Sequence, residues 1–120
     1  MKDLIHFKSA LRCSLSGIRS AFKHEIAFRH DVWLGVLNII GLVFVHIPCL
    51  VKLFLFVLWG GIIVTELINS AIEAVVDLVS PEWNELARDA KDMGSAAVFC
   101  AVLLLVVSWC VVLVKYFLYA

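Results

Sequence analysis

The chain has 120 residues, of which 63% are hydrophobic and 17% are charged, and its formal net charge is zero. Soluble domains are about half apolar, so the surplus indicates an integral membrane protein, and the neutral balance argues against a nucleic-acid partner. The four cysteines form no CxxC pair and show no His/Cys ligand spacing, which argues against a disulfide or zinc scaffold. We therefore expect a single all-α membrane domain over residues 1–120.

Residues 1–30 are predicted to form an amphipathic helix that lies in the membrane interface. Apolar side chains recur at steps of three and four residues, at Leu4, Phe7, Leu11, Leu15, Ile18 and Phe22. The basic residues Lys8, Arg12, Arg19 and Lys23 occupy the remaining surface, which is typical of an interfacial helix. The segment lacks the continuous apolar run of a signal peptide, so we do not expect it to be cleaved.

Three apolar segments follow, and each is predicted to cross the membrane. The first covers residues 32–51, which lack any formal charge and at about 1.5 Å per residue match a hydrocarbon core of roughly 30 Å. The second covers residues 53–79, and its polar end is expected to extend into the cytoplasm. The third covers residues 81–119, because a serine, a proline and a glutamate at 80–82 fit the start of a helix.

The distribution of basic residues predicts the orientation of these spans. Six Lys or Arg residues precede the first span, and Arg88 and Lys91 lie between the second and the third. Only Lys52 and Lys115 fall on the opposite side. By the positive-inside rule the N-terminus and residues 77–92 are cytoplasmic and the C-terminus is outside. We thus expect a multi-pass membrane protein.

One face of the second predicted span carries Glu66, Asn69, Ser70, Glu73 and Asp77. Helical geometry keeps these side chains within an arc of about 100° and places Glu66 about 24 Å along the span, just inside the cytoplasmic boundary. A carboxylate at membrane depth indicates function by default, and acids further out offer the oxygen ligands that Mg²⁺ prefers. The structural alternative is a hydrogen bond between Glu66 and either Asn38 or a neighbouring subunit.

Two further polar groups are candidates for the same site. One comprises Arg88, Asp89, Lys91, Asp92 and Ser95 near the start of the third span, and the other comprises Glu25, Arg29 and Asp31 before the first. A solvated helix face is the alternative interpretation of the first group. Because the chain has no GxxxxGK[ST] or GxGxxG segment, the usual nucleotide cradles are absent.

Residues 66–77 (ELINSAIEAVVD), 90–98 (AKDMGSAAV) and 25–29 (EIAFR) resemble the signature of the small bacterial diacylglycerol kinases. Together with the chain length, the three spans and the interfacial helix, the resemblance covers nearly the whole chain. It implies a homotrimer in the cytoplasmic membrane, with active sites shared between subunits. It also implies transfer of the γ-phosphoryl group of MgATP to the hydroxyl of diacylglycerol, which gives phosphatidic acid.

The resemblance further implies roles for individual residues. Glu66 would be the general base, and Glu25 and Glu73 would hold the Mg²⁺ ions that bridge the nucleotide phosphates. The nucleotide would contact Glu82, Trp83, Asn84, Lys91 and Asp92; Asn69 and Ser95 would support the base and the lipid hydroxyl; and Arg19 and Phe22 would lie along the lipid-binding edge. His6 and Cys13 depart from the basic and aromatic residues common in the family, which weakens the expectation of nucleotide contacts from the first helix.

Other functions remain open at this point. Close relatives in many Gram-positive bacteria phosphorylate undecaprenol, although the residues at 69–70 and 93–95 look more like the diacylglycerol branch. A small oligomeric channel with Glu66 and Glu73 lining a pore would conduct without ATP. A structural membrane subunit would be indifferent to the substitution Glu66→Gln.

Overall fold

The computed structural model describes residues 2–118 and is helical almost throughout. It contains α1 (Lys2–His24), α2 (Ile26–Phe44), α3 (Cys49–Val79), α4 (Glu85–Leu113) and a short π-helix, η1 (Val114–Leu118), that continues α4. Within the described residues, three helical stretches are long and apolar enough to cross a membrane. The all-α fold with three candidate spans is therefore confirmed, while residue 119, the expected end of the third span, lies outside the described residues.

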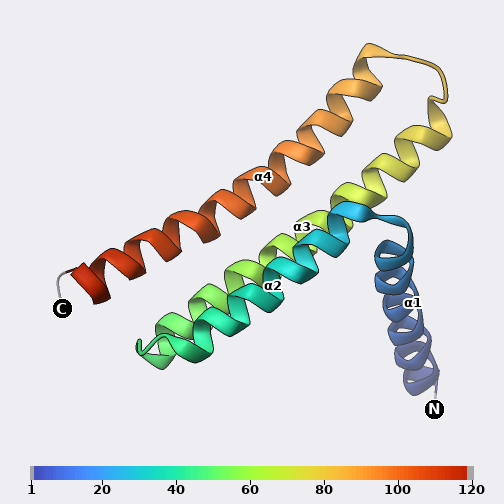
Figure 1. Cartoon of the computed structure of the whole chain (residues 1–120). Helices are drawn as coiled ribbons and strands as arrows, with labels where there is room; N and C mark the ends of the chain where they lie inside the picture. Colours follow the sequence, from blue (N-terminus) through green and yellow to red (C-terminus); the bar gives the residue numbers. More distant parts are fainter. Residues whose placement is uncertain (1, 119–120) are drawn as a thin grey trace.

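The helices α3 and α4 form a long antiparallel hairpin, and α2 packs along the first half of α3 (Figure 1). The helix α1 turns away from these three helices and projects to one side. The assembly is shallow, with principal extents of 54 × 48 × 21 Å. The α2–α3 turn and the end of α4 lie at one end of the hairpin, and the α3–α4 loop lies at the other.

The boundary between the first helix and the first span differs from our expectation. We predicted an interfacial helix over residues 1–30 and a span over residues 32–51. The chain instead breaks at Glu25, whose extended backbone (φ −102°, ψ 117°) separates α1 from α2. At its other end α2 stops at the turn 45–48, where Pro48 lacks an N–H and its fixed φ of −55° suits the start of α3.

Arg29 stabilises the break between α1 and α2. Its guanidinium donates hydrogen bonds to the backbone carbonyl oxygens of Phe22, at 3.0 Å, and Lys23, at 3.2 Å. These carbonyls belong to the last turn of α1 and have no partner within the helix, so a cationic donor satisfies them and complements the helix dipole. Arg29 thereby ties the end of α1 to the first turns of α2 and fixes the surroundings of Glu25.

The third span begins later than we predicted. We expected Ser80 to cap a helix from residue 81, but Ser80 ends α3, and its N–H donates to the Val76 carbonyl at 2.8 Å. The cap of α4 is Asn84, whose Oδ1 accepts a hydrogen bond from the N–H of Ala87 at 3.2 Å. Serine and asparagine are both favoured as N-caps. Asn84 rather than Ser80 caps α4, because the backbone hydrogen bonds of α3 continue through Ser80.

Apolar side chains from the three long helices form the core, in which Leu55 and Ile62 of α3 are fully buried and Leu105 of α4 is nearly so. A polar network crosses this core: the indole N–H of Trp109 donates to Asn38 Oδ1 at 2.8 Å, and Asn38 Nδ2 donates to the Leu55 carbonyl at 3.4 Å. The network joins α2, α3 and α4. The Asn38 amide bonds to these two groups and not to Glu66, so the Asn38 contact that we considered as a structural alternative is not found, while a contact of Glu66 with a neighbouring subunit stays a prediction.

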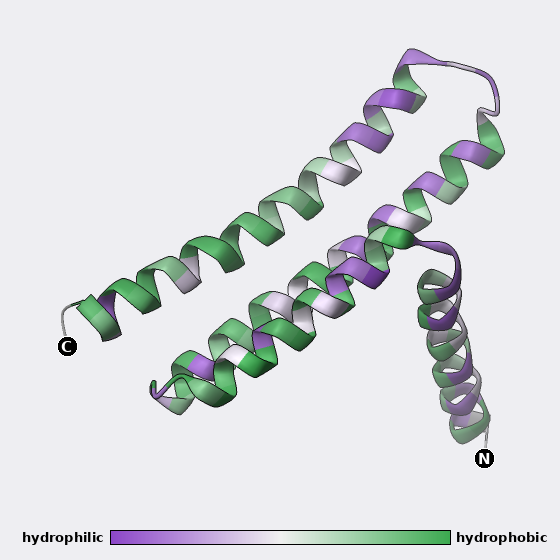
Figure 2. Cartoon of the chain, viewed as in Figure 1, coloured by the Kyte–Doolittle hydropathy of each residue, from purple (hydrophilic) through white to green (hydrophobic). Residues whose placement is uncertain are grey.

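Hydropathy is sorted along the hairpin (Figure 2). The end near the α2–α3 turn is predominantly apolar, and hydrophilic residues gather towards the α3–α4 loop. The helix α1 is hydrophilic along one side and apolar along the other. Its apolar side chains at 4, 7, 11, 15, 18 and 22 are all exposed, so the chain leaves this stripe available to another surface. That this surface is the membrane interface stays a prediction.

Candidate functional site

Glu66 and Asn69 lie on the face of α3 that the other helices cover. Only 3% of Glu66 and 6% of Asn69 is exposed, which makes Glu66 the one acidic residue among those described to be buried to this degree. One turn further along, Asn69 Nδ2 donates a hydrogen bond to Glu73 Oε1 at 3.2 Å. The stripe predicted from helical spacing thus contains a buried acid followed by an amide bonded to a second, half-buried acid.

Two acids from outside α3 approach the same place. The carboxyl groups of Asp31, Glu73 and Glu25 all lie close enough to Glu66 to act on it electrostatically. Asp31 belongs to the first turns of α2, and its Oδ2 is buried with no hydrogen-bond partner in the described part of the chain. Its backbone carbonyl accepts a hydrogen bond from the indole N–H of Trp59 at 2.9 Å, which fixes α2 against α3. Three segments therefore bring four carboxyl groups to one region.

This collection of acids has the chemistry of a divalent-cation site without being a complete one. Carboxylate oxygens are the ligands that Mg²⁺ prefers, and the ion commonly takes one or two of them and leaves its other positions to water and phosphate. Within residues 2–118, however, no three His, Cys, Asp or Glu side chains converge closely enough to hold a metal. Glu25 and Glu73 fit the type and number of ligands expected from the protein, and the buried, unpaired oxygen of Asp31 is consistent with a cation nearby.

The charged residues near the α3–α4 loop are paired within the chain. Lys91 Nζ lies 2.6 Å from Asp77 Oδ1, which links the two arms of the hairpin. Arg88 Nη2 lies 2.9 Å from Asp89 Oδ1, and Arg88 Nε lies 4.0 Å from Asp92 Oδ2. These side chains are exposed enough for a soluble ligand to reach them and compete for their charges.

The remaining predicted nucleotide residues lie in or beside the loop between α3 and α4. Trp83 is 79% exposed, and the Glu82 carbonyl accepts a hydrogen bond from the Ser80 hydroxyl at 3.2 Å. Asn84 caps α4, so its side-chain oxygen already has a partner. Lys91 approaches Asp77 across the hairpin, whereas the Trp83 side chain is largely exposed.

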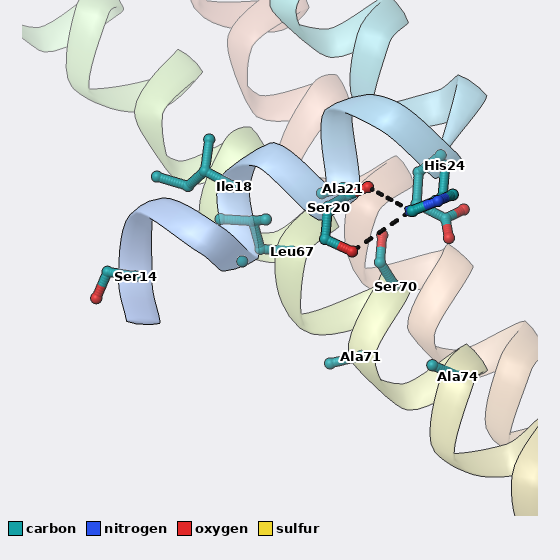
Figure 3. Close-up of a pocket in the computed structure, with 11 residues that line it drawn as sticks. Ser14, Ile18, Ser20, Ala21, His24, Leu67, Ser70, Ala71 and Ala74 are labelled. Atoms are coloured by element: carbon teal, nitrogen blue, oxygen red, sulfur yellow. Dashed lines mark hydrogen bonds between the residues drawn. The ribbon is translucent and has the colours of Figure 1, made fainter. Parts of the chain in front are cut away.

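A groove of about 530 Å³ lies between α1 and α3 (Figure 3). Its lining combines small, polar and large apolar side chains, namely Ser14, Gly17, Ile18, Ser20, Ala21, His24, Glu25, Leu67, Ser70, Ala71 and Ala74. His24 Nδ1 lies 3.1 Å from the Ser20 carbonyl and 3.4 Å from its hydroxyl, and the Ser70 hydroxyl is buried without a hydrogen-bond partner among the described residues. The groove reaches Glu25, so it adjoins the acids around Glu66.

Three predicted lipid-site residues lie apart from this lining. Arg19 and Phe22 are on exposed parts of α1, and Ser95 is exposed on α4. In this single chain they do not join Glu66 and Asn69 in one enclosed site. Of the predicted residues, the structure brings together Glu25, Glu66, Asn69 and Glu73.

Two residues to which we assigned no role now belong to the site. Asp31 joins the acids around Glu66, and the sequence signal was its place in the polar group at 25–31. Gly94 on α4 is buried against the Asn69 side chain, because a Cβ at this position would overlap Asn69 Oδ1. Its signals in the sequence were its place within residues 90–98, which carry part of the family resemblance, and the occurrence of a glycine within a predicted span, although glycine is common in such helices.

Comparison with known proteins adds to this geometry. A sequence model of the family described as prokaryotic diacylglycerol kinase matches residues 12–113. The diacylglycerol kinase of Escherichia coli K12 is 36% identical over 104 residues, which cover 87% of this chain and 85% of the relative. That of Haemophilus influenzae is 38% identical over 88% of this chain and 90% of the relative. That of Pseudomonas aeruginosa is 40% identical over 83% and 81%, respectively.

Proposed function

The chain belongs to the prokaryotic diacylglycerol kinase family, and we propose that it transfers the γ-phosphoryl group of ATP to the free hydroxyl of diacylglycerol, giving phosphatidic acid. As a member of this family it is a lipid kinase of the bacterial membrane. The observation that carries the proposal is the buried Glu66, a carboxylate on a membrane-spanning helix near three other acids. A carboxylate at that depth suits a hydroxyl presented by a lipid.

In the proposed mechanism Glu66 accepts the proton of the lipid hydroxyl. The oxygen forms a bond to the γ-phosphorus while the bond to the β-phosphate bridging oxygen breaks, so ADP leaves and the proton passes from Glu66 to solvent. Such transfers depend mainly on positioning and on neutralising charge, with general-base help worth about 10²–10⁴ in rate.

Glu25 and Glu73 are the residues that would hold Mg²⁺, the cation we propose as cofactor. When bound, the ion would neutralise the charge of the phosphate oxygens. The hydrogen bond from Asn69 to Glu73 Oε1 orients that carboxylate, and Arg29 fixes the chain around Glu25. The Glu73 carboxylate is therefore oriented, and the backbone beside Glu25 is fixed, before any ligand binds.

Lys91 and Asp92, with the loop residues Glu82 to Asn84, are proposed to contact the nucleotide. They lie at the hydrophilic end of the hairpin, and the side chains of Lys91 and Asp92 are accessible. For the lipid we propose Asn69 and Ser95 near the acceptor hydroxyl, and Arg19 and Phe22 along the edge by which it enters. This division keeps the soluble substrate at the polar end and the apolar one beside the spans.

We also propose that the N-terminus and the α3–α4 loop face the cytoplasm and that α1 lies in the membrane interface. Eight of the ten Lys and Arg residues then lie on the cytoplasmic side, where ATP is available. The exposed apolar stripe of α1 would insert into the headgroup region. A membrane-impermeant thiol reagent added to spheroplasts should not label Cys13. Labelling of Cys13 from outside would contradict the proposed cytoplasmic position of the N-terminus.

Homotrimer formation with shared active sites completes the proposal. Two observations support it: the acids of one chain do not converge into a metal site within residues 2–118, and Ser95, Arg19 and Phe22 lie apart from Glu66. Co-expression of Glu66→Gln with a variant in which Arg19 and Ser95 are both replaced by alanine should then restore activity that is lost in either variant alone. Failure of such mixed oligomers to regain activity, with both chains shown to co-purify, would contradict a shared site.

The direct test of the proposed function is an assay of the purified protein with MgATP in mixed micelles. We expect transfer of phosphate from γ-labelled ATP to diacylglycerol at a rate well above that with undecaprenol, because the matched relatives are named as diacylglycerol kinases. Phosphorylation of undecaprenol in preference to diacylglycerol would identify undecaprenol as the lipid substrate instead. Phosphorylation of neither lipid would refute the proposal.

A further inference from the structure

Gly94 lies where α4 comes closest to the Asn69 side chain of α3. A Cβ at residue 94 would overlap Asn69 Oδ1 and would lie 3.3 Å from Asn69 Cγ. The glycine is not required by its backbone, because the described part of the chain contains no residue with a positive φ. Alanine would favour the helix over glycine, so the small residue at this position reflects the close approach to Asn69 rather than helix stability.

The contact determines which way the Asn69 amide points. Asn69 Oδ1 is buried and has no hydrogen-bond partner in the described residues, while Nδ2 donates to Glu73 Oε1 at 3.2 Å. The amide is planar, so the space that receives its oxygen also sets the direction of its NH₂ group. The reverse orientation would place the amide oxygen against the Glu73 carboxylate, and two acceptors repel each other.

We propose that Gly94 is a positioning residue for the metal ligand Glu73, acting through Asn69. Because residue 94 has no side chain, the Asn69 oxygen can lie against α4 at this position. The NH₂ group of Asn69 then points at Glu73 and holds its carboxylate in the orientation that the cation needs. This inference rests on the proposed function, in which Glu73 holds Mg²⁺. Stability alone does not account for the arrangement, because both a helical glycine and an unpaired buried oxygen are unfavourable.

The substitution Gly94→Ala tests the proposal. We expect the Mg²⁺ concentration that gives half the maximal rate to rise at least 10-fold, in line with the roughly 10–100-fold loss that follows removal of a partner of a metal ligand. Binding of Mn²⁺ together with a non-hydrolysable ATP analogue, measured by electron paramagnetic resonance, should weaken by a similar factor.

Gly60→Ala is the matched control. Gly60 lies in α3, and a Cβ there meets no heavy atom within 4 Å in this chain. The substitution makes the same chemical change in a spanning helix and should leave both the Mg²⁺ dependence and Mn²⁺ binding unchanged. An equal effect of Gly60→Ala and Gly94→Ala would mean that the cation dependence reports a general change of the helices, and would overturn the proposal.

A double variant separates positioning from packing. If Gly94 acts through Asn69, then Gly94→Ala added to Asn69→Ala should have no further effect on Mn²⁺ binding, because the side chain that it displaces is already gone. The double variant should also fold where Gly94→Ala alone does not, since the overlapping amide has been removed. Additive effects, or a folded Gly94→Ala protein with normal Mn²⁺ affinity, would refute the inference. The wild-type assay reports separately on the proposed function, because an active wild type with an unaffected Gly94→Ala variant leaves lipid phosphorylation intact.

Discussion

The Glu66→Gln protein should fold and bind MgATP normally but phosphorylate diacylglycerol at a rate at least about 100 times lower than wild type, the lower range of general-base contributions. Glutamine keeps the size of the side chain and its capacity to hydrogen-bond, but it cannot take the proton of the acceptor hydroxyl. The loss should appear in kcat at saturating MgATP and lipid, because the removed interaction belongs to the transition state. Initial rates in mixed micelles measure it.

Folding of the same variant should be unimpaired. Glu66 is 3% exposed and near Asp31, Glu73 and Glu25, so replacing it with a neutral amide removes a repulsion without changing volume. The neighbouring substitution Thr65→Val serves as the control, because the Thr65 hydroxyl donates only to the Gly61 carbonyl one turn back, at 2.7 Å. Near-normal turnover of Glu66→Gln would remove Glu66 from the chemistry. An equal loss in Thr65→Val would attribute the effect to a disturbed α3.

The helices could be predicted from the sequence because each depends on a local pattern. A span is an apolar run of sufficient length, and the polar stripe of α3 follows from the helical repeat, so Glu66, Asn69 and Glu73 could be placed on one face before the fold was known. The residues at which helices begin and end were harder to predict. Ser80 and Asn84 are both good caps, and only the continuation of the α3 ladder through Ser80 decides between them.

Contacts between helices could not be predicted from the sequence. Asp31 joins the acids around Glu66 because Trp59 and Asn38 hold α2 against the other spans at one particular depth. Gly94 matters because α4 crosses α3 opposite Asn69. Neither depth nor crossing point is encoded in a periodicity, since both depend on how side chains from different helices pack.

A Lys91→Met variant should have a kcat/KM for MgATP about 100 times lower than wild type, the size of effect seen when one charge-stabilising donor is removed from an active site. Methionine keeps the apolar stem of lysine but cannot neutralise a phosphate. The KM for diacylglycerol should be unchanged, because Lys91 is at the polar end of the hairpin, near the loop. Steady-state rates at varied MgATP measure the change.

The partner of Lys91 distinguishes this role from a structural one. Lys91 Nζ lies 2.6 Å from Asp77 Oδ1, and 66% of the Asp77 side chain is exposed. An exposed ion pair contributes little to stability, so breaking it should barely change the free energy of unfolding whichever partner is replaced. Asp77→Asn leaves the lysine charge free for phosphate, and it should therefore change kcat/KM less than about threefold. If Lys91 served only the hairpin, Asp77→Asn and Lys91→Met would have the same small effect. We expect unequal effects on kcat/KM. Lys91→Met removes the ammonium group that would bind ATP, whereas Asp77→Asn removes only the carboxylate that competes with ATP for this group.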